Sequence, residues 1–320
     1  MVFKLKGNDV IKEQDIEVTE SLIGIYGYNN SGKTTILKEL DKVIDEENIK
    51  CIVNDGEYIR SIFIPTNRVI VKQAHTSSTP IKDIEEFLAY KKDSYNEFDL
   101  HLKVIRENML GNSAVKQVIK NAILYMFGED YEFEFDRRQS DGVENIINIY
   151  CSIIWLFTWD KDIEDIKYDK LKQLLCDTSA IVMIDEIEAF LHVYVQSRML
   201  QKFKEDFSKC SFVFTTHSPL LLSRYYNIRK FQLDNGILNE INADLYYKDL
   251  DNIYEDYFNV EEFPKEAGEI INRLGDYICG EEYNRDVIVK DLEILNEQYA
   301  NVKAKYPGLV AKAEVKLGVE

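Results

Sequence analysis

The fold is decided by Gly27-Tyr28-Asn29-Asn30-Ser31-Gly32-Lys33-Thr34, a stretch near the start of the chain. It follows Leu22–Tyr26, a short apolar run typical of a buried strand, and leads into Lys33–Ile44, whose apolar residues fall on one helical face. A G-x-x-x-x-G-K-T pattern between a strand and a helix binds phosphate, because backbone N–H groups and the helix dipole both point at the anion. The sequence therefore predicts a phosphate loop at the edge of a sheet.

The residue types in this loop also predict what it binds. A lysine at position 33 reaches the β- and γ-phosphates of a nucleotide, and a hydroxyl at position 34 is a ligand for Mg²⁺. We therefore expect ATP and Mg²⁺ as cofactors. The candidate nucleotide-binding residues in this stretch are Asn29, Asn30, Ser31, Gly32, Lys33, Thr34 and Thr35.

Two acidic residues follow a second apolar run. Ile181–Ile184 reads as a buried strand, and Asp185 and Glu186 come directly after it. Such a strand places its last carboxylate at the carboxyl edge of the sheet, beside the phosphate loop. We expect Asp185 and Thr34 to hold Mg²⁺, and Glu186 to take a proton from the attacking water. The alternative for a strand that ends in two acids is an ordinary turn.

A histidine occupies the equivalent place after the next apolar run. His217 follows Ser211–Thr216, and Ser218-Pro219 after it is typical of the start of a helix. The order along the chain, with the loop first, then the carboxylates and then the histidine, favours a contact between His217 and the γ-phosphate. The alternative is a structural histidine.

A small hydroxyl and a glycine open a third apolar segment. Ser140-Asp141-Gly142 precedes Val143–Trp159, which reads as a buried helix. Ser140 and Gly142 fit a second phosphate-binding surface, which would complete a site across two chains; an ordinary helix cap is the alternative. Arg137 and Arg138 fit solvated charges, DNA contacts or phosphate contacts equally.

Composition limits the class of protein. The chain has 320 residues, 45% of them hydrophobic, which is enough for one large α/β domain and an appendage. The chain has 57 acidic and 39 basic residues, and this net charge of −18 argues against a protein that coats nucleic acid through bulk charge. The five cysteines form no C-x-x-C pair, and Ile146–Trp159 is shorter than the ~20 apolar residues that span a bilayer. We expect a soluble, cytoplasmic protein.

The remaining pattern predicts two regions. We expect an α/β domain over residues 1–236, with a helical insertion at about 76–130, and an acidic helical C-terminal region over 237–320 that contacts other proteins. The C-terminal region has 19 acidic and 9 basic residues and an apolar stripe from Ile288 to Val302. Further strands are predicted at Val2–Lys6, Asp15–Thr19, Ser61–Ile64, Tyr131–Phe135, Ala180–Ile184 and Ser211–Thr215. Two aromatic residues, Phe3 and Tyr28, are candidates to stack on the base, and the sequence favours neither.

Taken together, these elements resemble the ABC-type ATPase superfamily, in which phosphate loop, signature helix, carboxylates and switch histidine occur in this order. The run Asp185-Glu186-Ile187-Glu188-Ala189-Phe190-Leu191-His192 looks like that of the OLD-like and AAA_15/AAA_21-type branch, as does Ile64-Pro65-Thr66-Asn67-Arg68. The signature departs from the transporter pattern, because Gln139-Ser140-Asp141-Gly142-Val143-Glu144 replaces Leu-Ser-Gly-Gly-Gln.

The resemblance implies an α/β P-loop ATPase head with a mixed, mainly parallel sheet. It implies a homodimer or higher oligomer in which Lys33 and Thr34 of one chain and Ser140 and Gly142 of another enclose ATP. Glu186, His217 and Lys33 would be the catalytic residues.

The C-terminal region adds a narrower resemblance. Asp244-Leu245, Ile253–Val260 and Pro264-Lys265-Glu266 look like the last segment of the ATPase subunits of Septu-type antiphage systems and their retron-associated relatives. Those subunits act beside a separately encoded HNH-type nuclease. This implies a separate nuclease or effector partner, with nucleic acid contacted through the complex and no membrane partner. The alternatives are a DNA-repair or recombination ATPase that clamps DNA itself, an ATP-bound scaffold that silences a toxic effector, and the nucleotide-binding subunit of a transporter.

Overall fold

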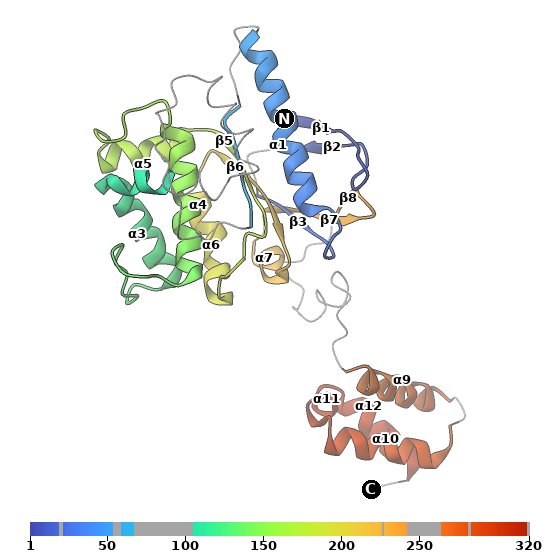
Figure 1. Cartoon of the computed structure of the whole chain (residues 1–320). Helices are drawn as coiled ribbons and strands as arrows, with labels where there is room; N and C mark the ends of the chain where they lie inside the picture. The colour runs from blue at the N-terminus through green and yellow to red at the C-terminus, as the bar shows by residue number, and fades with distance from the viewer. Residues whose placement is uncertain are drawn as a thin grey trace. The chain divides into compact units, whose positions relative to one another are not determined.

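The computed structural model describes residues 1–18, 22–53, 59–66, 105–225, 227–241, 264–280 and 283–318 (Figure 1). The chain divides into two units, Met1–Lys248 and Asp249–Glu320. The first unit holds the sheet and the predicted nucleotide site, and the second is helical.

A six-stranded sheet forms the centre of the first unit. Its strand order is β4-β5-β6-β3-β7-β8, and all neighbours are parallel except the last pair, β7 and β8. The bounds are β3 Leu22–Tyr26, β4 Ser61–Ile64, β5 Ala180–Ile184, β6 Cys210–Thr216, β7 Ile228–Asp234 and β8 Ile237–Glu240. A separate antiparallel pair consists of β1 Val2–Leu5 and β2 Gln14–Glu17. The α/β class and the mixed, mainly parallel sheet are as the sequence predicts.

The strand order brings distant parts of the chain together. Strand β6 lies between β3 and β5, with Tyr26 opposite Thr216 and Ile184 opposite Phe214. Because these three strands are parallel, their carboxyl ends lie at one edge of the sheet. The phosphate loop, the two acidic residues and the histidine directly follow these strands, so all of them lie at that edge.

Helices cover both faces of the sheet (Figure 1). Helix α1, Lys33–Val53, packs with β1 and β2 on one face, where Ile181 and Met183 of β5 join its core. The intervening Val182 and Ile184 are buried outside that core, as the period-two alternation of a strand requires. The other helices of this unit are α3 Ser113–Phe127, α4 Asp141–Thr158, α5 Tyr168–Asp177, α6 Val193–Asp206 and the short α7 Pro219–Ser223.

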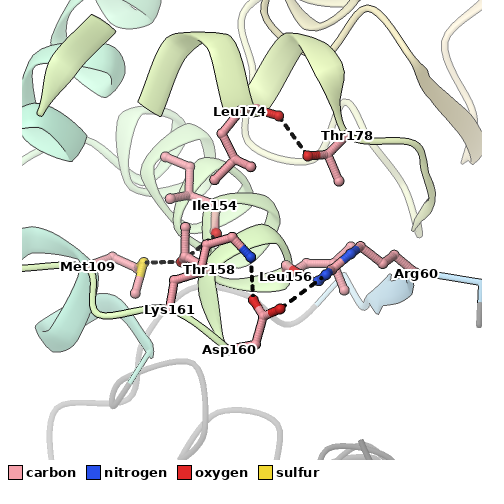
Figure 2. Close-up of polar contacts among 9 residues, drawn as sticks. All are labelled: Arg60, Met109, Ile154, Leu156, Thr158, Asp160, Lys161, Leu174 and Thr178. Atoms are coloured by element: carbon pink, nitrogen blue, oxygen red, sulfur yellow. Dashed lines mark hydrogen bonds and ion pairs between the residues drawn. The ribbon is translucent and has the colours of Figure 1, made fainter. Parts of the chain in front are cut away.

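The end of α4 is attached to the edge strand β4 through Arg60. Figure 2 shows the Arg60 guanidinium donating to the Leu156 carbonyl at 3.0 Å and to Asp160 at 3.3 Å, while Lys161 pairs with the same carboxylate at 2.8 Å. Within α4, the Thr158 hydroxyl donates to the Ile154 carbonyl at 2.8 Å. Helix α4 is therefore held at its end by polar contacts and along its length by burial.

Two details of the sequence prediction need correction. Tyr131–Phe135 is not a strand but a loop, in which the rings of Phe133 and Phe135 lie 4.7 Å apart and Tyr131 packs on Phe127 of α3. No ladder partner for this segment is present among the described residues. The sheet also continues past residue 236, because β8 pairs with β7. Of the predicted insertion, residues 76–104 lie outside the described part, while residues 105–111 and α3 are helical.

The second unit contains four helices in its described residues. They are α9 Lys265–Cys279, α10 Arg285–Glu297, α11 Ala300–Lys305 and α12 Pro307–Leu317. The predicted stripe is confirmed, since Ile288, Leu292, Leu295 and Val302 are buried in one core. Most of the acidic excess lies before these helices: residues 237–263 carry eight acidic side chains and one lysine, against eleven and eight in residues 264–320. The described helices include none long and apolar enough to cross a membrane.

A bidentate ion pair joins α9 to α10. The Arg273 guanidinium donates to both carboxylate oxygens of Asp291 at 2.8 Å, and the Asp291 side chain is almost fully buried.

We expect Arg273→Ala to lower the local stability of the second unit by about 2 kcal/mol, because it leaves a buried carboxylate without its partner. Hydrogen exchange of the α9 and α10 amides in the full chain measures this loss. Lys265→Ala on the same helix removes only a solvated 4.0 Å pair with Glu269 and should leave exchange unchanged. Equal exchange in the two variants would contradict the assigned role of the ion pair.

Candidate nucleotide site

The phosphate loop follows β3 and has the backbone that such a loop needs. Asn30 and Gly32 have positive φ angles of 63° and 100°, so the chain curls before α1 begins. A Cβ atom on Gly27 would lie 2.7 Å from the Leu233 carbonyl oxygen, so only glycine fits against β7 there. The Gly32 carbonyl accepts the first helical bond, from Ile36 at 2.9 Å. The loop geometry predicted from the sequence is thus present.

Lys33 points back over this loop. Its Nζ donates to the carbonyls of Gly27 and Tyr28, both at 2.9 Å, and the residue is only 7% exposed. Burial lowers the pKa of Lys33, although the carboxylates of Asp185, Glu186 and Glu188 oppose this effect. Ser31 Oγ is buried and makes no hydrogen bond with any described residue. An ammonium group and an unsatisfied hydroxyl in a curled loop are suited to phosphate oxygens.

Asp185 is the centre of a set of oxygen atoms. Its Oδ2 accepts from the hydroxyls of Thr34 at 2.8 Å and Thr66 at 2.9 Å, and its Oδ1 accepts from Thr215 at 2.6 Å. The carboxylate directly follows β5, and the hydroxyls come from α1, the residues after β4, and β6. A carboxylate next to a hydroxyl suits Mg²⁺, which takes one or two protein oxygens and completes its shell with phosphate and water. Thr34 and Asp185 therefore fit the ion.

Two members of this set were not identified from the sequence. In the sequence, Thr66 is part of a run that resembles a family, and Thr215 is part of a predicted strand. Each lies at or just after the end of a buried parallel strand, and that position was the available signal.

Glu186 occupies a strained backbone position. Its φ angle is 44°, in the left-handed region that glutamate rarely adopts, and its amide donates to Thr215 Oγ1 at 2.7 Å. Such strain persists only where surrounding contacts enforce it, and it concentrates at functional sites. Glu186 is half-buried, and its negative charge raises the pKa of Lys33. Its carboxylate therefore belongs to the same site.

His217 lies at the same edge, directly after β6. It is half-buried, and its amide donates to Glu188 Oε1 at 2.5 Å. The sequence did not assign a role to Glu188. The structure therefore brings Lys33, Thr34, Asp185, Glu186 and His217 to one edge of the sheet.

Ser140 is exposed just before α4, whereas Gly142 is buried in the first turn of that helix. Ser140 has the backbone of a helix cap, but its exposed hydroxyl makes no capping bond, so the ordinary-cap alternative loses its main support. A Cβ atom on Gly142 would lie 2.7 Å from the Phe190 carbonyl oxygen, and Asn145 Nδ2 donates to the Ala189 carbonyl at 2.6 Å. Gly142 thus permits a close approach inside the chain. Within the described residues, no hydrogen bond or ion pair joins Ser140 or Gly142 to the phosphate loop.

The two aromatic candidates for base stacking differ in exposure. Phe3 is 4% exposed and belongs to the core under α1, so it is not available to a base. Tyr28 is 51% exposed at the start of the phosphate loop, and its contact with a base stays a prediction.

One family profile matches part of the chain. The AAA_21 family, described as an AAA domain, putative AbiEii toxin, Type IV TA system, matches residues 171–223. This segment contains Asp185, Glu186 and His217. No curated protein matches the chain.

Solved structures that match the chain include ABC transporters and their subunits. The ATP-binding subunit of an ABC transporter shares 16% identity over 80% of this chain and 98% of its own, with a TM-score of 0.43. The structure of cbiO1 from Clostridium perfringens, part of the ABC transporter complex cbiONQ, shares 12% identity with this chain. That match covers 85% of this chain and 92% of cbiO1, with a TM-score of 0.39. A bacterial Atm1-family ABC exporter with ATP bound shares 15% identity with a TM-score of 0.43; the match covers 80% of this chain and 40% of the exporter.

The partial family match and the site geometry agree with each other. The matched segment supplies Asp185, Glu186 and His217, which the structure brings to the edge of the sheet where the phosphate loop lies.

We expect Lys33→Ala to weaken ATP binding at least ~100-fold, because it removes a buried cation worth up to about 3 kcal/mol to a phosphate. Calorimetric titration with Mg-ATP measures the affinity. Lys38→Ala, an exposed lysine on the same helix, should bind ATP like the wild type. Unaltered affinity in the Lys33 variant would show that the loop does not bind phosphate in this way.

Proposed function

We propose that this chain binds and hydrolyses ATP as an ABC-type ATPase subunit. The observation that carries the proposal is the hydrogen bond of 2.8 Å between Thr34, the last residue of the phosphate loop, and Asp185 after β5. Lys33 and His217 lie at the same edge of the sheet. A hydroxyl and a carboxylate that meet in this way form the protein half of a magnesium–nucleotide site.

Each residue at this edge has a chemical task in that reaction. Backbone amides of the loop and Lys33 would bind the β- and γ-phosphates and offset their charge. Thr34 and Asp185 would hold Mg²⁺, which when bound neutralises charge on the phosphate oxygens. Glu186 would accept a proton from the attacking water, and His217 would contact the γ-phosphate. Positioning and charge stabilisation account for most of the catalysis in such transfers.

We further propose that ATP joins two copies of the chain. Lys33 and Thr34 of one copy would hold the nucleotide, and Ser140 and Gly142 of the other would cover its γ-phosphate. The exposed, uncapped Ser140 hydroxyl at the start of an 18-residue helix supports this proposal, because the helix dipole and the hydroxyl are both available to an anion.

The cellular role we propose is a cytoplasmic antiphage defence complex in which this ATPase controls a separate, HNH-type nuclease. The basis is the resemblance of the C-terminal segment to Septu-type subunits, of which residues 244–260 lie outside the described part of the chain. The acidic excess of residues 237–263 suits contact with a protein better than contact with DNA. Phage protection by this gene together with a neighbouring nuclease gene, and its loss when either is deleted, tests the proposal.

We expect Glu186→Gln to bind ATP with unchanged affinity and to hydrolyse it at least ~100-fold more slowly, because the amide cannot accept a proton from water. Phosphate release under saturating Mg-ATP measures the rate. Glu134→Gln, in an exposed loop, serves as the control and should retain full activity. Normal turnover in the Glu186 variant would remove the general-base assignment.

We expect Ser140→Ala in the Glu186→Gln background to weaken ATP-dependent association of the chain about tenfold, the loss of one charge-assisted hydrogen bond. Sedimentation velocity with and without Mg-ATP measures the association. Ser113→Ala, at the exposed start of α3, should leave association unchanged. If both serine variants associate like the parent, the helix start does not contact the second nucleotide.

A further inference from the structure

Glu188 is a half-buried glutamate, with one carboxylate oxygen fully buried, that the reaction described above does not use. It lies two residues after Glu186, and the buried Ile187 separates the two glutamates. Its Oε1 accepts the His217 amide at 2.5 Å, while its Oε2 is buried and accepts no hydrogen bond of standard geometry from a described residue. A carboxylate that loses its hydration needs hydrogen bonds in exchange, and the His217 amide and the Thr216 side chain supply them.

The surroundings of Glu188 place it inside the nucleotide site. Burial raises the pKa of Glu188, although the hydrogen bond from the His217 amide opposes this rise. Glu188 also raises the pKa of Lys33, as Asp185 and Glu186 do. The three carboxylates therefore interact electrostatically with the same lysine.

A second connection joins the same two loops but does not touch His217. The Ser218 hydroxyl donates to Gln196 Oε1 at 2.7 Å, and Gln196 Nε2 donates to the Leu191 carbonyl at 2.9 Å. Glu188 and Gln196 therefore each connect the loop after β5 with the residues that follow β6. Only the first acts directly on the backbone of His217.

We propose that Glu188 is a positioning residue that sets the orientation of His217 through its backbone amide. This inference rests on the proposed function, because it takes His217 as the group that contacts the γ-phosphate. Glu186 and Glu188 lie on one short loop whose backbone is fixed at Glu186 by the bond to Thr215. The bond from Glu188 to His217 thus fixes the distance between the general base and the histidine.

A double-mutant cycle on the full chain tests the proposal, with kcat, KM and ATP affinity measured for each variant. Glu188→Ala should lower kcat about tenfold at unchanged ATP affinity, since one hydrogen bond to a charged group is lost. Glu188→Gln keeps a carbonyl oxygen for the His217 amide and should stay within about threefold of the wild type. The double variant Glu188→Ala, His217→Ala should hydrolyse ATP no more slowly than His217→Ala alone, because residues that act through one another are not additive.

Controls separate positioning from stability. Ser218→Ala removes the second connection and should change kcat less than threefold. Thermal unfolding reports whether each variant folds, and Glu188→Asp, which is shorter by one methylene, replaces the alanine variant if that one does not fold.

Three results would overturn the proposal: additive losses in the double variant, a glutamine variant as slow as the alanine variant, or a loss of ATP affinity in place of kcat. A wild-type chain without ATPase activity would instead overturn the proposed function itself.

Discussion

The structure of the site depends on the buried carboxylate of Asp185. Three hydroxyls from three other segments, Thr34, Thr66 and Thr215, donate to its two oxygens. Hydrogen bonds to a charged group contribute roughly 1.5–3 kcal/mol each, and the residue is only 4% exposed, so each segment is held where its hydroxyl meets the carboxylate. A single strand end thereby aligns the helix after the phosphate loop, the end of the edge strand and the strand before His217.

The loop after Asp185 extends this alignment to the rest of the first unit. Its first residue, Glu186, is held in a left-handed backbone conformation by Thr215, and its later carbonyls at Ala189 and Leu191 accept from Asn145 of α4 and Gln196 of α6. The helix that begins at Ser140 is thus fastened to the loop that carries Glu186. In the proposed ATP-bound pair of chains, this would connect the surface proposed to meet the partner's nucleotide with the chain's own Glu186.

Prediction from sequence succeeded where one local pattern determines both conformation and chemistry. The phosphate loop is such a case, because glycine, lysine and threonine at fixed spacing need only a strand before them and a helix after them. The same reasoning failed for Tyr131–Phe135, where aromatic alternation reflects ring packing in a loop. It also missed Thr66, Thr215 and Glu188, whose functional surroundings come from segments more than 25 residues away.

By itself, the sequence determined the α/β class, the phosphate loop and the order in which loop, carboxylates and histidine follow three buried strands. Local propensity and side-chain chemistry suffice for these features, because each depends on a few neighbouring residues. Only the tertiary structure decided that β6 lies between β3 and β5, that Asp185 takes three hydroxyls, and that Gly142 meets the Phe190 carbonyl. These features depend on strand order and on contacts between distant segments, and both are set when the sheet assembles and buries its two faces.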